Sequence, residues 1–254
     1  MLGAVFQSVW KLRETKILLL FALYPTLYLI GSFFGESNFM QISVEPGHEL
    51  SYLSFLGMML LSVDGFILPT LAMSYLTITV FRKEVDQHTL FLYKDIKRER
   101  VFVAKYLSLL AIVALYFLLF ALIALAIYYG RVAHMSIGAN LFFDQSLEQT
   151  LFSLASLLAI VMKMCFALTV LTLVSLFVPT ASTMLTALLL TITMLVTGVL
   201  GGWVGMLFPN GYTAFVEMGE QGVWLAFAGP ILVTIAYTII GTSMGAKKFA
   251  RLEF

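Results

Sequence analysis

The sequence predicts an all-α membrane protein with six transmembrane helices, and three observations lead to this prediction. Apolar residues make up 61% of the 254 residues and charged residues only 11%, against roughly 45–50% and 25% in soluble domains. The mean hydropathy is +0.97. Apolar stretches of about 20 residues, enough to cross a bilayer as a helix, recur along the chain. We therefore expect a single transmembrane domain over residues 1–254, and these features argue against a soluble enzyme.

The first predicted element is an amphipathic N-terminal helix over residues 1–16 that lies in the membrane interface. Its apolar side chains recur at the spacing of one helical face. They are Leu2, Val5, Phe6, Val9 and Trp10. Tryptophan and basic side chains favour the headgroup layer. We expect this interfacial helix to anchor the chain to membrane lipid, and the alternative is that it also transmits motion.

Six membrane spans are expected to follow this helix. They cover residues 17–34, 52–80, 101–129, 150–178, 181–208 and 223–245. The run from Lys163 to Val216 contains no further charge and is too long for a single helix, and Pro179–Ser182 predicts a tight hairpin between the fourth and fifth spans within it. Proline also predicts an interruption at Pro25 and kinks at Pro69 and Pro230.

Glycine is frequent in the last two spans and between them. The stretch 198–212 is long and rich in glycine, so part of it is expected to dip back into the membrane. The alternative is an ordinary turn with interfacial Trp and Tyr. Gly241 and Gly245 predict close packing of span six on a neighbouring helix.

The basic residues predict that both termini are cytoplasmic. All but two of the 15 Lys and Arg residues lie before span one, between or just inside spans two and three, or after span six. Lys and Arg are retained on the cytoplasmic side of a membrane. The loops on the other side are acidic and carry Glu36, Glu45, Glu49, Asp144, Glu148, Glu217 and Glu220. We expect a multi-pass protein of the cell membrane, namely a bacterial plasma membrane.

The segment 81–100, between spans two and three, is the only sizeable cytoplasmic loop. It mixes both signs of charge with an apolar cluster from Leu90 to Ile96. Acidic residues early and basic residues late suit the dipole of a short helix, and the apolar cluster offers a face for a partner's groove. The alternative is a solvated linker, which explains the basic residues but not the apolar ones.

The span pattern and this loop resemble the transmembrane subunits of type-2 ATP-binding-cassette exporters. In that family the loop carries an acidic residue, a Gly-Thr-Leu-like step, an apolar pair, a proline, basic residues and a Lys that opens the third span. The matching residues are Glu84, Thr89, Leu90, Phe91, Leu92, Arg98 or Arg100, and Lys105. His88 stands where glycine is usual, and the region of Lys94 and Asp95 lacks the customary proline.

The resemblance implies that segment 81–100 is a cytoplasmic coupling helix that docks on a separate ATP-binding-cassette ATPase subunit. ATP and magnesium would bind to that partner, and this permease chain would hold no cofactor of its own. Its nearest approach to a phosphate-binding loop, Gly241–Lys248, has the wrong spacing. The resemblance also implies a second permease subunit, which makes a homodimer or a pair with a sister chain. The transported cargo would leave the cell.

The chemistry of that cargo follows from the side chains available to line a route. Phe, Met and Leu dominate the spans, and such linings favour an amphipathic or hydrophobic molecule over a sugar or an ion. A hydrophobic peptide, a lantibiotic-like antimicrobial, a drug or a lipid would each fit. The sequence does not separate these cargoes.

Two charged residues are predicted deep within spans. Asp64 is the thirteenth residue of span two and Lys163 the fourteenth of span four. Both spans run in the same direction, so the two residues lie at similar depth. Each charge alone would cost about 2.5–3.5 kcal/mol on insertion. We expect them to pair, within one subunit or across a dimer, and the alternative is that one of them lines the cargo route.

Other functions find less support in the sequence. The net charge of +1 argues against nucleic-acid binding. Cys165 is the only cysteine, which excludes an intramolecular disulfide and a thiolate metal cage. No catalytic residue or metal site is predicted, because the chain has no HExxH or Gly-x-Ser-x-Gly motif and its three histidines fall on different loops. The remaining alternatives are a non-transporting sensor or immunity module and a channel subunit.

Overall fold

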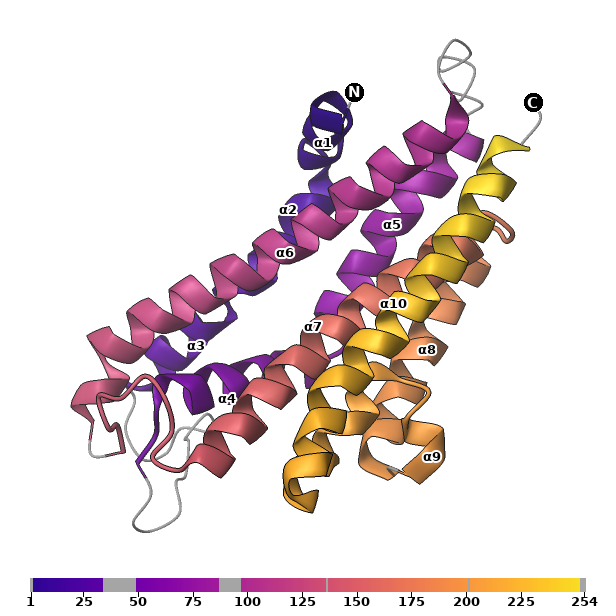
Figure 1. Ribbon diagram of the computed structural model, residues 1–254. Coiled ribbons are helices and arrows are strands. Elements are labelled where there is room, and N and C mark those ends of the chain that lie inside the picture. The colour runs from indigo at the N-terminus through magenta and orange to yellow at the C-terminus, as the bar shows by residue number, and fades with distance from the viewer. Residues whose placement is uncertain (1, 34–48, 87–96, 136, 201, 252–254) are drawn as a thin grey trace.

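The computed structural model describes residues 2–33, 49–86, 97–135, 137–200 and 202–251, and this part of the chain is helical (Figure 1). No strand occurs within it, and an isolated bridge joins Leu50 to Gly138. Five of the described helices are long and apolar enough to cross a membrane, and a bent helix pair would make a sixth span. The chain is therefore a multi-pass, all-α membrane protein, as its composition predicts.

The N-terminal region consists of short helices. They are α1 (Leu2–Trp10), α2 (Arg13–Leu20), η1 (Phe21–Leu23) and α3 (Tyr24–Gly31). The helix expected over residues 1–16 therefore ends at Trp10, because the buried Thr15 hydroxyl donates a 2.7 Å hydrogen bond to the Val9 carbonyl and the chain turns between them. Pro25 lies in the first turn of α3, where its missing N–H costs nothing, and the span is interrupted just before it.

The second predicted span is two helices, α4 (Tyr52–Gly65) and α5 (Leu68–Asp86). They are bent by 64° at the residues between them, so residues 52–80 are not one kinked helix. The long helix α6 (Arg98–Gly130) begins three residues before the predicted third span and is followed by η4 (Val132–His134). In Figure 1, α4 turns away from the direction of α5 toward the lower end of α6.

The C-terminal half is built from long helices and one compact connection. They are α7 (Leu147–Ser175), α8 (Thr180–Leu200), α9 (Gly202–Gly205), η5 (Pro209–Met218) and α10 (Glu220–Ala250). The hairpin between α7 and α8 lies where Pro179 predicts it, and the 3-10 helix η5 folds back to pack on α7 and α10. Pro230 lies inside α10, which is one uninterrupted helix in the structure.

Glycines set how closely these elements approach. A Cβ atom on Gly245 would lie 2.6 Å from the Phe102 ring of α6, and one on Gly241 would lie 2.7 Å from the Thr169 side chain of α7. The backbones of Gly205 and Gly211 nearly touch, since a Cβ on Gly211 would lie 2.1 Å from the Gly205 carbonyl oxygen. Small residues thus bring α10 against two neighbours and hold η5 against α9.

The two ends of the bundle differ in charge. We call "terminal end" the end that holds α1, the last turns of α5, the first turns of α6 and the last turns of α10, all of which lie at the top of Figure 1. Most basic residues of the described helices are there, including Lys11, Arg13, Arg82, Arg98, Arg100, Lys247 and Lys248. We call "far end" the end with η4, η5 and the starts of α4 and α7; it carries Glu49, Asp144, Glu148, Glu217 and Glu220.

The outer faces of the helices are apolar. Large side chains there remain exposed, such as Leu118, Leu122, Leu189, Leu232, Ile239 and Ile240. The interior is also apolar and aromatic, with Phe55, Tyr116, Phe120 and Tyr128 fully buried. A bundle that is apolar both inside and outside suits lipid as its solvent.

Candidate functional site

The break between α4 and α5 is built into the backbone of residues 65–68. Ile67 has a φ of 63°, a conformation in which a β-branched side chain is strained. Pro69 lies two residues later, and its ring would clash with the carbonyl of Gly65 if the helix ran through. The N–H groups of Phe66 and Ile67 instead donate hydrogen bonds to the carbonyls of Val63 and Asp64, three residues earlier. The direction of the chain therefore changes at a fixed place within the predicted span.

The structure brings Asp64 and Lys163 together at this break. The Lys163 ammonium of α7 donates a hydrogen bond to Oδ2 of Asp64, the penultimate residue of α4. The two side chains are 3% and 15% exposed. The ammonium also lies at the C-terminal end of α4, where the carbonyls of the last turn favour positive charge. The pair thus joins the end of α4 to the middle of α7 within one subunit.

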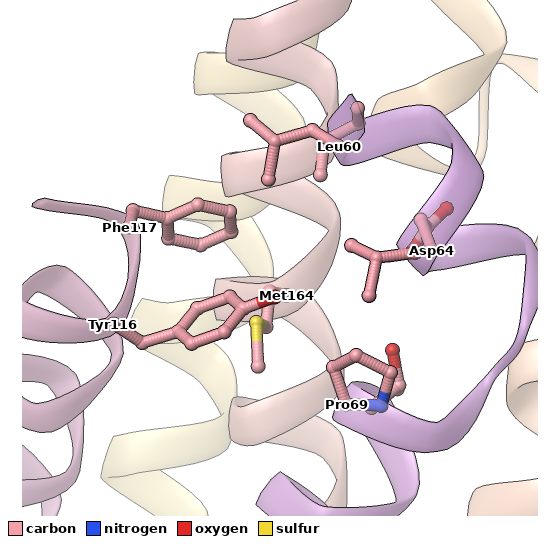
Figure 2. A pocket seen from close by; sticks show the side chains of 9 residues that line it. Leu60, Asp64, Pro69, Tyr116, Phe117 and Met164 are labelled. Carbon is pink, nitrogen blue, oxygen red and sulfur yellow. The ribbon is translucent and has the colours of Figure 1, made fainter. Parts of the chain in front are cut away.

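A small cavity lies beside the pair (Figure 2). Figure 2 shows Tyr116 and Phe117 of α6 facing Asp64 and Pro69, with Met164 of α7 between them. The cavity has room for about one water molecule. It is therefore too small for an organic ligand, and most of the residues that line it are apolar. Tyr116 is fully buried here and was not identified from the sequence, where it is one of many aromatic residues in span three.

An apolar groove runs along the other side of the break. It has a volume of about 510 Å³ and lies between the α2–α3 segment and the start of α5. Its walls include Leu20, Leu23, Leu27, Phe66 and Leu68, all of which are exposed. The groove shares Val63 and Pro69 with the cavity beside the ion pair. An apolar molecule of moderate size would fit against the break from this side.

A second group of interest lies at the terminal end around Lys105, which is 3% exposed. Its ammonium donates a 3.0 Å hydrogen bond to the Val80 carbonyl and lies 5.8 Å from the ring centroids of Phe81 and Phe249. The Phe102 ring packs against both, with its centroid 5.3 Å from that of Phe81 and 5.9 Å from that of Phe249. We call Lys105, Phe81, Phe102 and Phe249 the Lys105 cluster. It holds α5, α6 and α10 together next to the predicted coupling segment.

The structure describes only the flanks of that segment. Glu84 lies in the last turns of α5, and Arg98 is the first residue of α6. Thr89, Leu90, Phe91 and Leu92 lie outside the described residues. The two flanks therefore leave the bundle from helices that the Lys105 cluster holds side by side. The spacing of the family motif placed Lys105 next to the segment but gave no sign that it is buried.

Metal-binding and phosphate-binding groups are scarce among the described residues. No group of three or more His, Cys, Asp or Glu in the described ranges could hold a metal ion. The stretch 241–248, which most resembles a phosphate-binding loop, is part of helix α10, and its two glycines pack on Thr169 and Phe102.

No known protein family, curated protein or solved structure matches the chain.

Proposed function

We propose that this chain is the membrane-spanning permease subunit of an ATP-driven exporter. The observation that carries the proposal is the second span, which is broken at a fixed point and joined there to α7 by a buried ion pair. Broken helices within membranes are typical of transporters, where the break adjoins the route of the cargo. The proposal also depends on the resemblance of segment 81–100 to the coupling loop of type-2 ATP-binding-cassette exporters.

In this proposal α5 is the lever that carries force from the terminal end to the break. The helix has 19 residues and is about 28 Å long at about 1.5 Å per residue. The Lys105 cluster ties its last turns to α6 and α10, and the Thr79 hydroxyl donates a 3.3 Å hydrogen bond to Glu14 of α2. A separate ATPase subunit, which binds ATP and magnesium, docks on segment 81–100. Its closure moves the end of α5 and changes the bend at Ile67.

The apolar groove beside the break favours an amphipathic or hydrophobic cargo. Its volume of about 510 Å³ and its leucine-rich wall suit a drug, a lipid tail or the apolar part of a peptide, including a lantibiotic-like antimicrobial. A second permease subunit, identical or a sister chain, completes the route. The exposed apolar faces of α8 and α10 leave ample surface for lipid and for that subunit.

The charge difference between the two ends supports an orientation with both termini in the cytoplasm of a bacterial cell. The terminal end is basic and the far end is acidic. Retention of Lys and Arg on the cytoplasmic side therefore places segment 81–100 where an ATPase subunit could reach it.

Purification from native membranes tests the proposal. The chain is extracted in mild detergent with whatever it binds, and the ATPase activity of the complex is measured. We expect the complex to contain a subunit that hydrolyses ATP. Glu84→Ala or Thr89→Pro should either remove this subunit from the complex or abolish the stimulation of its ATPase activity. Glu220→Gln, at the far end, is the matched control and should change nothing. A stable complex without a nucleotide-hydrolysing subunit would favour the sensor or the channel.

A further inference from the structure

A cavity of about 600 Å³ opens at the far end between α4, the start of α7 and η5. It shares no lining residue with the small cavity beside the ion pair or with the apolar groove. Its volume lies within the range of small-molecule binding sites. The cavity is therefore large enough for a ligand of its own.

Asp144 fixes the walls of this cavity. Its Oδ1 accepts hydrogen bonds from Ser51 and Ser54, each 2.5 Å long, and its Oδ2 accepts one of 2.9 Å from Ser153. Ser51 is the N-cap of α4, and Ser153 lies on α7. One carboxylate thus holds the first turns of two helices together, and the cavity between them is preformed.

The charge of the cavity is negative. Three further carboxylates line it, from Glu49 before α4, Glu148 in the first turn of α7 and Glu217 of η5. All three are exposed, and no Lys, Arg or His is among the described residues that line the cavity. Apolar side chains also line the cavity, among them Met58, Leu61, Phe152 and Val216. A ligand here meets both negative charge and apolar surface.

Ser156 supplies a polar group that lacks a partner. It lies one helical turn after Ser153 on the cavity side of α7 and is only 6% exposed. Its hydroxyl makes no hydrogen bond to any other described residue, although the neighbouring hydroxyls of Ser51, Ser54 and Ser153 are all bonded to Asp144. The hydroxyl is therefore open to the cavity and can accept a hydrogen bond from a ligand with an N–H group.

We propose that this far-end cavity binds an amphipathic organic cation, whose ammonium lies among the carboxylates and donates to Ser156 while its apolar body lies against Phe152 and Met58. A metal ion is a poorer fit, because no three acidic side chains in the described part of the chain come close enough to ligate one. The proposal concerns binding alone, so it stands whether or not the chain takes part in export.

Gly57 offers a direct means of closing the cavity. It lines the wall on α4, and a Cβ atom placed on it would meet nothing within 4 Å. Gly57→Leu should therefore project its side chain into the cavity without a clash at its base. Replacing glycine in the interior of a helix also favours the helical state.

The experiment uses the purified full chain in nonionic detergent with dansylcadaverine, a fluorescent amphiphile with a primary ammonium, and its N-acetylated form, which is uncharged. We expect saturable binding of the amine, and at least about tenfold weaker binding of the acetylated probe because a charged hydrogen bond is lost. The double variant Glu148→Gln with Glu217→Gln should weaken binding about fivefold or more. Gly57→Leu should abolish binding while the melting temperature is kept.

Glu220→Gln is the matched control, since Glu220 is an exposed carboxylate of the far end that does not line the cavity. It should leave the affinity unchanged. Equal binding of the two probes would overturn the proposal, and so would equal losses in Glu220→Gln and in the double variant. Normal binding by a folded Gly57→Leu chain would overturn it as well.

Discussion

Removing either charge of the Asp64–Lys163 pair should destabilise the protein strongly. The two side chains are 15% and 3% exposed, and apolar residues surround them. Loss of one partner leaves the other charge buried without compensation, which costs about 3–5 kcal/mol. We therefore expect Asp64→Asn and Lys163→Met each to lower the free energy of unfolding by about that amount.

The two changes together should cost far less than their sum. Replacement of a whole buried ion pair by uncharged side chains is often neutral, so the double variant is expected within about 1 kcal/mol of the original protein. The single losses sum to at least about 6 kcal/mol, so the coupling energy is at least about 5 kcal/mol. The exchanged pair, Asp64→Lys with Lys163→Asp, should likewise recover stability that each single exchange loses.

Unfolding by increasing mole fractions of sodium dodecyl sulfate in mixed micelles, followed by circular dichroism, measures these free energies. Lys247→Met serves as the control, because Lys247 is exposed on α10 and its loss should change stability by less than about 0.5 kcal/mol. If the double variant loses the sum of the two single losses, the two residues do not interact. The break would then have to be held by its backbone alone.

Two further predictions concern packing. Lys105→Met removes the 3.0 Å hydrogen bond to the Val80 carbonyl and the cation beside the aromatic rings. It should lower the free energy of unfolding by about 2 kcal/mol. A loss under about 0.5 kcal/mol would contradict the role of the Lys105 cluster. Gly211→Ala forces its backbone away from Gly205 and should cost about 3 kcal/mol, whereas Gly130→Ala has open space and should cost little. Equal melting temperatures for the two alanine variants would refute that reasoning.

Composition and helix geometry were sufficient to predict the class of the fold and the placement of the intramembrane charges. Because the rise per residue of a helix is constant, counting from the span ends placed Asp64 and Lys163 at one depth. Because a lone charge in an apolar bundle is costly, a partner was expected. Each of these predictions depends on one dominant physical quantity. The length of the apolar stretches determines the class of the fold, and the cost of burying a charge determines the pairing of Asp64 with Lys163.

The break itself was harder to predict, because its geometry depends on tertiary structure. Gly65 and Pro69 mark the place, but Ile67 is a β-branched residue whose type gives no sign of a positive φ. The sequence therefore predicted a kink where the structure has a 64° change of direction between two helices.

The Asp144 network could not be predicted for a different reason. Asp144 was assigned to an acidic loop, while Ser51 and Ser54 lie some 90 residues earlier in the chain. Serine is common in membrane helices and gives no periodic signal of its own. Only the folded chain brings these hydroxyls to one carboxylate, and with them the cavity that contains Ser156.

The central claim is that the terminal end receives force from a nucleotide-driven partner, and cross-linking from residue 86 tests it most directly. A photoreactive amino acid replaces Asp86, the last residue of α5, in the native membrane, so that Glu84 and the other residues of the family motif are kept. The cross-linked product is then probed with a photoreactive ATP analogue. We expect one cross-linked subunit that also takes the nucleotide label, on the cytoplasmic side. Cross-links to lipid alone, or access of a membrane-impermeant reagent to residue 86 from outside the cell, would contradict the account.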